Sequence, residues 1–171
     1  MSDEVAVMSP AKAKLQLALL NSSAANLEKS DFIVRFTNAG LPQEIVLMLY
    51  DLWDKTKVVG GEVINIGRIL LAKIWEFVAA NPNMLIGVAC GAAVGALANL
   101  IPFIGPFLAP TAMAIGAVVG GIWGFQQDRA NRGEEIKGGP IGVAESLVAM
   151  AKEFFKLFAG ILTALKDYFT A

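Results

Sequence analysis

Two residue types on which much enzyme chemistry depends are missing or scarce in this chain. Histidine is absent, and Cys90 is the single cysteine. The lack of histidine removes the commonest general base and the commonest metal ligand. One cysteine cannot form an internal disulfide, and Cys90 lies in an apolar stretch where a structural role is expected. We therefore predict no catalytic residue, no metal site and no cofactor, and a protein that is not an enzyme.

Motifs for phosphates and nucleic acids are also lacking. No glycine run is followed by the Lys–Ser/Thr pair of a phosphate-binding loop. The stretch GAAVGALANL has neither the preceding strand nor the later acidic residue of a dinucleotide-binding fingerprint. A net charge of −1 gives no electrostatic reason to bind nucleic acid. We predict no nucleic-acid partner.

Charge is scarce, and one long segment has none. Charged residues make up 17% of the chain and hydrophobic residues 56%, against about 25% and 45–50% in typical domains. Residues 77–127 contain no Asp, Glu, Lys or Arg, and Pro102, Gly105 and Pro106 lie near the middle of this run. Its halves, 83–101 and 107–125, would each reach about 28 Å as helices, and a bilayer core is about 30 Å thick. We predict two antiparallel spans joined by a tight turn at those three residues.

Glycines recur at every fourth position in both predicted spans. They are Gly87, Gly91 and Gly95 in the first span and Gly116, Gly120 and Gly124 in the second. Each glycine inside a helix costs about 1 kcal/mol relative to alanine, so a compensating gain is expected. In lipid, small residues at this spacing let two helices approach closely. We predict that the six glycines are helix-packing sites, either within one hairpin or between subunits.

The free energy of inserting the first span is small. Seven of its nineteen residues are Leu, Ile or Val. At about 0.3–0.6 kcal/mol each, they contribute of order 3 kcal/mol, before the glycines and two asparagines subtract from it. Two alternatives follow. Flanking amphipathic helices could hold the apolar hairpin until a trigger releases it, or oligomerisation could retain it in the membrane.

The N-terminal part is predicted to consist of helices. Ser9 and Pro10 have the pattern of an N-cap followed by a first helical residue. Gly40 is typical of a helix end, and Gly60 with Gly61 is expected to end another helix. We expect a helix over 10–29, a short turn over 31–40, a helix from 42 to 57 and an amphipathic helix over 62–80.

The C-terminal part is predicted to be one amphipathic helix from about Ile141 to Phe169. Apolar residues at near-heptad spacing mark one stripe, which suits a seam against other helices. These are Val143, Leu147, Met150, Phe154, Phe158, Ile161 and Leu165. An interfacial helix lying on a membrane is the alternative. Three lysines are balanced by three carboxylates in this segment, so we predict an oligomer or bundle seam.

Together these patterns predict an all-α membrane protein with a central glycine-zipper transmembrane hairpin flanked by amphipathic helices. We expect one folding unit, with N-terminal helices in 1–80, the apolar hairpin in 83–125, a polar linker in 126–140 and the C-terminal helix in 141–171. The N-terminus has no cleavable signal pattern. Basic residues flank the hairpin on both sides and none lies in its turn, which predicts both termini in the cytoplasm.

The leading hypothesis is a non-enzymatic protein that inserts in a lipid bilayer, forms homo-oligomers and permeabilises or gates the membrane. Two alternatives stay open: a membrane-anchored structural or adaptor protein with no conductive pore, and a soluble bundle that shields the apolar hairpin. A central apolar hairpin among amphipathic helices is similar in plan to pore-forming colicins and related helical toxins. That likeness covers the hairpin alone and carries no residue roles.

Overall fold

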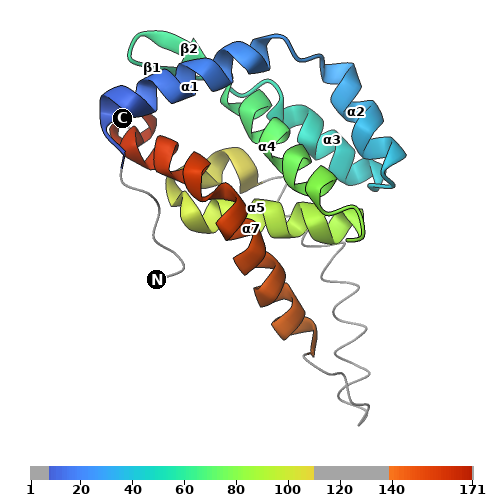
Figure 1. Ribbon diagram of the computed structural model, residues 1–171. Coiled ribbons are helices and arrows are strands. Elements are labelled where there is room, and N and C mark those ends of the chain that lie inside the picture. The colour runs from blue at the N-terminus through green and yellow to red at the C-terminus, as the bar shows by residue number, and fades with distance from the viewer. Residues whose placement is uncertain (1–7, 110–138, 171) are drawn as a thin grey trace.

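The computed structural model describes residues 8–109 and 139–170, and this part of the chain is mostly helical (Figure 1). Its helices are α1 (Pro10–Ala25), α2 (Lys29–Asn38), α3 (Gln43–Leu52), α4 (Ile66–Ala80), α5 (Ile86–Leu100), α7 (Gly139–Ala164) and α8 (Lys166–Thr170). A short 3-10 helix, η1 (Pro102–Ile104), follows α5, and residues 105–109 continue as helix. Strands β1 (Lys57–Val59) and β2 (Glu62–Ile64) form a β-hairpin.

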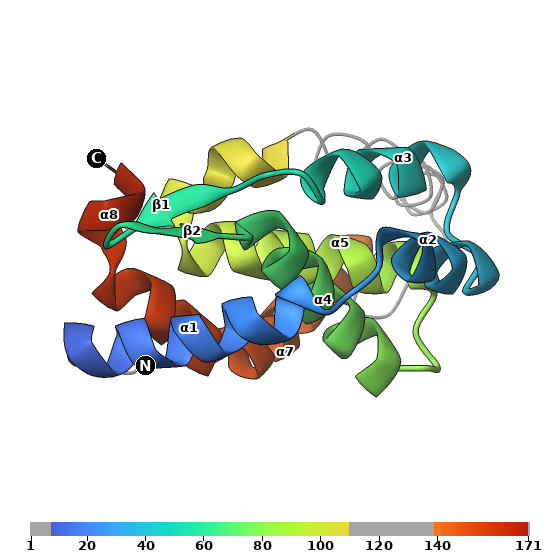
Figure 2. The same cartoon turned by 90° about the horizontal axis from the view of Figure 1, so that it is seen from above.

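The apolar helix α5 lies inside the bundle. It packs most extensively against α7 and also against α4, while α1 packs along α7 and α4. Helices α2 and α3 pack against each other, and α3 contacts α4. Viewed from above, α8, the tip of the β-hairpin and the start of α1 lie at one end of the bundle, and α2 lies toward the other end (Figure 2).

Local sequence signals explain where the first helices begin and end. The Ser9 hydroxyl accepts a hydrogen bond from the main-chain N–H of Lys12 (3.2 Å), which confirms the predicted N-cap. Gly40 adopts φ +96°, and the N–H of Leu41 donates to the carbonyl of Phe36 (3.1 Å), as in a Schellman motif. The predicted stop at Gly40 is thus confirmed. Between these two signals the structure differs from the prediction. Helix α1 ends at Ala25, and the segment expected to be a short turn forms the ten-residue helix α2.

The segment around Gly60 and Gly61 is a β-hairpin, so the prediction of helices on both sides of it is wrong here. Helix α3 ends at Leu52 and α4 begins only at Ile66. Both glycines have positive φ, +59° and +85°, which is the requirement of a two-residue type I′ turn. Val58 and Val59 before the glycines, and Val63 with Ile64 after them, favour extended strands over a helix.

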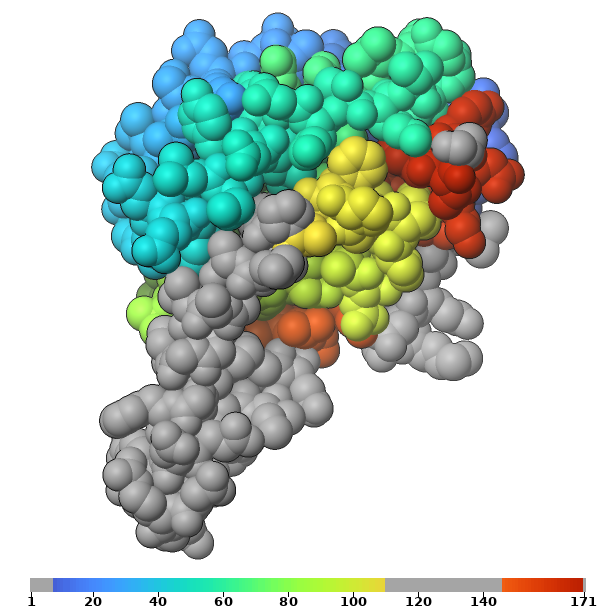
Figure 3. Space-filling model, turned by 180° about the vertical axis from the view of Figure 1, so that it is seen from behind, coloured from blue at the N-terminus to red at the C-terminus, as the bar shows by residue number. Residues whose placement is uncertain are grey.

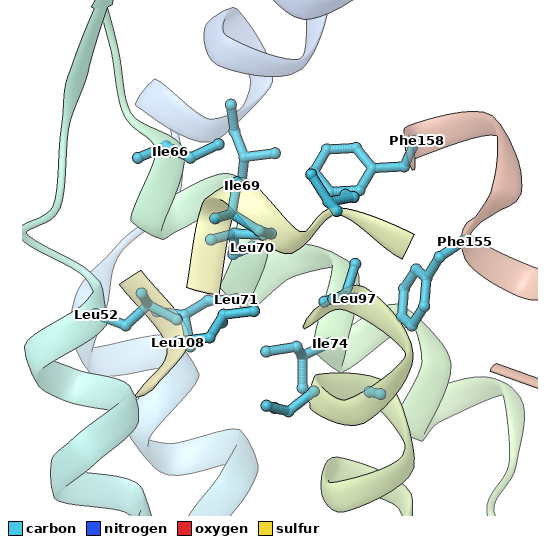
Figure 4. Packing of buried hydrophobic residues seen from close by; sticks show 14 of the residues in the cluster. Leu52, Ile66, Ile69, Leu70, Leu71, Ile74, Leu97, Leu108, Phe155 and Phe158 are labelled. Atoms are coloured by element: carbon cyan, nitrogen blue, oxygen red, sulfur yellow. The ribbon is translucent and has the colours of Figure 1, made fainter. Parts of the chain in front are cut away.

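The core forms where α4 meets α5 and α7. Figure 4 shows Leu97 of α5 facing Phe155 of α7, with Ile74 of α4 beside them. Leu108, beyond the end of α5, lies near Leu52 and Leu71. Each fully buried side chain of this size contributes about 1.5–3 kcal/mol by its removal from water. The apolar run therefore supplies much of the core of the described fold.

Candidate functional site

The candidate site consists of α5 and the segment that follows it, which lie within the described part of the uncharged run. Helix α5 begins at Ile86, three residues later than the predicted span. The preceding turn closes α4, because the Asn81 side chain donates to the carbonyl of Phe77 (2.8 Å). Helix α5 ends at Leu100, since Ile101 precedes Pro102 and a residue before proline disfavours the helical conformation.

The chain bends sharply at the proline, where the sequence predicts a break. Helix α5 and the segment Pro102–Ala109 meet at an angle of 116°. Of the three predicted turn residues, Pro102 lies at this bend, whereas Gly105 and Pro106 lie in the helical segment 105–109. Figure 3 shows the yellow segment that ends at residue 109 at the surface, adjoining the β-hairpin and the red C-terminal residues. The remainder of the predicted second span, residues 110–125, lies outside the described residues.

A membrane span cannot be assigned to one helix of the described chain. None of these helices alone combines the length and the apolar composition needed to cross a bilayer. Helix α5 and Pro102–Ala109 satisfy both requirements only when taken together, across the bend.

Small side chains allow α5 to be enclosed closely. Its buried residues are Ala89, Cys90, Ala92, Ala93, Val94, Ala96, Leu97 and Leu100. The facing helix α7 buries Ala151, Ala159 and Gly160, so that both helices present small residues at their contact. On the α4 side, Ile74 and Phe77 are fully buried. The apolar helix is thus covered by two amphipathic neighbours.

The described glycines of the predicted zipper, Gly87, Gly91 and Gly95, are all half-buried in α5. A Cβ atom at Gly95 would lie 3.7 Å from Cγ2 of Val148, so this glycine faces α7. A Cβ atom at Gly87 would meet nothing within 4 Å, and Gly91 is half-buried. Gly116, Gly120 and Gly124 lie outside the described residues. Packing between the two glycine stripes stays a prediction.

The buried face of α7 differs from the predicted seam. Phe158, Ile161 and Leu165 are buried as expected and Leu147 is half-buried, whereas Met150 and Phe154 are exposed. The side chain of Val143 lies outside the described residues. Helix α7 is rotated so that Ala151, Phe155 and Leu162 face the bundle instead. A stripe of large apolar residues does not reveal this rotation of α7, because small side chains such as Ala151 also lie on its buried face.

Two structural elements were not predicted at all. The Asn21 side chain accepts hydrogen bonds from the main-chain N–H (2.7 Å) and side chain (3.1 Å) of Asn65, and it donates to the carbonyl of Val63 (3.1 Å). This contact joins α1 to the β-hairpin and to the start of α4. The second element is the Gly-Gly turn itself, which the flanking valines could have revealed.

The chemistry available to the described residues is limited. No group of three Cys, Asp or Glu side chains among them is arranged to hold a metal ion. Cys90 is fully buried in α5. A cavity of about 240 Å³ between α1 and the β-hairpin is lined by Lys14, Leu15 and Glu62 among others. Its mixed lining includes no pair of nucleophile and base.

No protein-family model matches this sequence, and no curated protein or solved structure is significantly similar to it. The functional argument therefore depends on the geometry of α5, its neighbours and the exposed surface.

Proposed function

We propose that this protein is a non-enzymatic, membrane-inserting helical protein that self-assembles and permeabilises or gates a bilayer. One observation carries the proposal. Helix α5 lies within a 51-residue run without charge, and it packs between α4 and α7 in the described fold. Triggered insertion requires an apolar helix that is buried by neighbouring helices and becomes exposed when they separate from it.

Two free energies decide whether α5 stays in the bundle or enters a bilayer. Helix α5 contains five Leu, Ile or Val residues, which gain about 2 kcal/mol in total on entering lipid. Leaving the bundle also gives up the burial of large side chains at this contact, such as Leu97 and Phe155, each worth about 1.5–3 kcal/mol in the core. The proposal therefore requires a trigger with a larger free-energy gain, namely binding to a membrane surface together with association of several copies.

Opening the bundle would create the rest of the membrane-active surface. Separating α5 from α7 exposes Ala151, Phe155 and Leu162 on α7, next to the already exposed Phe154. A helix with such a wide apolar face can lie at a membrane interface or pack against other helices. In the proposal, α5 and the residues beyond Pro102 insert, and α7 stabilises the assembled state.

A disulfide between α5 and α7 tests whether this separation is necessary. The variant is Cys90→Ala, Gly95→Cys, Val148→Cys, in which the Gly95 and Val148 positions are already in side-chain contact range. Dye release from liposomes is measured for the oxidised and the reduced protein. We expect release only after reduction, because the closed disulfide holds α5 under α7.

The reduced form of the same variant is the matched control, and Cys90→Ala alone checks the effect of removing the native thiol. Equal dye release by oxidised and reduced protein would contradict insertion by separation of α5 from α7. Vesicle binding by the wild type without dye release would favour the adaptor alternative. A wild type that neither binds nor permeabilises vesicles would favour a bundle that only shields its apolar helix.

A further inference from the structure

One end of the described bundle combines exposed aliphatic side chains with an excess of lysines. Leu15 and Leu19 of α1 are 61% and 57% exposed, and they lie one helical turn apart on the outer face. Val58 and Val63 are directly paired across the β-hairpin and are 58% and 59% exposed. We call these four residues the aliphatic patch.

The aliphatic side chains point outward because the opposite faces of both elements are occupied. In α1, Ala13 and Leu17 are buried against the bundle, which leaves Leu15 and Leu19 on the far side. In the β-hairpin, Val59 and Ile64 are buried, and alternation places Val58 and Val63 on the outer face. The two elements adjoin, since the Asn21 side chain of α1 donates a hydrogen bond to the carbonyl of Val63 (3.1 Å).

Charges near the aliphatic patch are mainly positive. Helix α1, the β-hairpin and helix α8 carry four lysines and two carboxylates: Lys12, Lys14, Lys57, Lys166, Glu62 and Asp167. Helix α1 itself contains no acidic residue. The segment 28–55, with α2 and α3, shows the opposite balance of three cations and five carboxylates. The lysine excess around the aliphatic patch thus contrasts with the acidic balance of α2 and α3.

The bend after α5 lies beside this basic end. Helix α8 contacts both η1 and β1, and the rings of Phe103 and Phe169 are 5.8 Å apart. Lys14 of α1 lies over the ring of Tyr168 in α8, 4.9 Å from its centroid. A membrane that binds the aliphatic patch would thus lie close to the bend at Pro102.

We infer that the aliphatic patch and its lysines form a docking face for the anionic headgroups of a lipid bilayer. Aliphatic side chains that enter the headgroup region, together with lysines beside them, are the combination that binds peripheral proteins to anionic membranes. Docking by this face presents the bend at Pro102 to the membrane first. This inference rests on the proposed function and identifies the surface by which it begins.

The experiment measures flotation of the full-length protein with vesicles of phosphatidylcholine alone and of phosphatidylcholine with phosphatidylglycerol. Two patch variants are used, Leu15→Ser with Leu19→Ser, and Lys12→Ala with Lys14→Ala. We expect each to reduce binding to anionic vesicles about tenfold or more, since each removes two groups that enter or approach the membrane. Wild-type binding should also fall at high salt, which screens the lysines.

Matched variants on α2 and α3 provide the controls. Val34→Ser with Leu47→Ser removes two side chains that are each 54% exposed, and Arg35→Ala with Lys55→Ala removes two positive charges. Both should bind anionic vesicles as the wild type does. Thermal unfolding followed by circular dichroism verifies that all four variants keep the fold.

Equal loss in patch and control variants, or no loss in either patch variant, would overturn the inference. So would a change in sedimentation with unchanged vesicle binding, because the patch would then be a contact between copies. Dye release separates this inference from the proposed function. Patch variants that bind and release dye like the wild type contradict the docking face alone. Patch-dependent binding without dye release contradicts the proposed function alone.

Discussion

No side chain fits between Gly67 and the main-chain carbonyl of Leu52. A Cβ atom at position 67 would overlap that carbonyl oxygen, so α4 passes the end of α3 at backbone contact. The N–H of Gly67 also donates to the carbonyl of Lys55 (3.0 Å), just beyond α3. These contacts fix the position at which α4 leaves the β-hairpin and enters the core.

Gly67→Ala is expected to lower the free energy of unfolding by about 1–3 kcal/mol or more, because the methyl group forces α3 and α4 apart. Urea unfolding followed by circular dichroism measures the change. Gly87→Ala is the matched control in α5, where a Cβ atom meets nothing within 4 Å. It should be neutral or stabilise the fold by up to about 1 kcal/mol. Similar effects of the two substitutions would contradict the close contact at Leu52.

Two adjacent phenylalanines of α7 should behave very differently. Phe155 is buried against the core, and its ring is 5.8 Å from that of Phe77. Phe155→Ala should destabilise the fold by about 3–5 kcal/mol, since it leaves a cavity. Phe154 is exposed and retains only ring contacts, so Phe154→Ala should cost about 1 kcal/mol. Thermal or urea unfolding of both variants tests the orientation of α7, and a reversed order would support the seam predicted from sequence.

The turn of the β-hairpin predicts an asymmetry between asparagine and valine substitutions. Gly60 and Gly61 both have positive φ, which asparagine tolerates and a β-branched residue does not. Gly60→Asn should leave stability almost unchanged. Gly61→Val should cost about 1–2 kcal/mol from the left-handed backbone alone. Unfolding curves of the two variants distinguish this turn from the helix end that the sequence suggested at these glycines.

Cys90 is a native reporter of whether α5 is covered. Its side chain is fully buried, and it is the single cysteine of the chain. A maleimide should label the folded protein at least about a thousandfold more slowly than the unfolded protein, because labelling requires opening of the bundle. Mass spectrometry of timed samples measures the rate. Rapid labelling without denaturant would show that α5 is accessible in the native state.

Sequence patterns were most reliable where a single local interaction decides the structure. The Ser9 cap, the Gly40 helix end and the break at Pro102 are of this kind, and all three occur where they were expected. Each depends on φ preferences or hydrogen bonds within about five residues. The mostly helical fold follows from the same local signals.

The orientation of α7 could not be read from its sequence, because tertiary packing decides it. The predicted stripe selects large apolar side chains, whereas the structure buries Ala151 and Ala159 against an alanine-rich helix. The close contact between small residues directs this face of α7 toward α5 and leaves Met150 and Phe154 exposed on another face. The contact between Gly67 and Leu52 was equally hidden, since no pattern in the sequence relates the two positions before α3 and α4 are placed.

The bend at Pro102 makes bilayer thickness a variable in the proposed activity. Helix α5 has fifteen residues and is about 22 Å long, several ångströms shorter than a typical hydrocarbon core. Inserted with the bend intact, it would suffer hydrophobic mismatch, which the membrane relieves by thinning. Short acyl chains remove that cost, whereas long chains require the 116° bend to straighten and recruit residues beyond Pro102. The proline thereby ties insertion to the acyl-chain length of the target membrane, and dye release should be faster from vesicles of shorter-chain lipids.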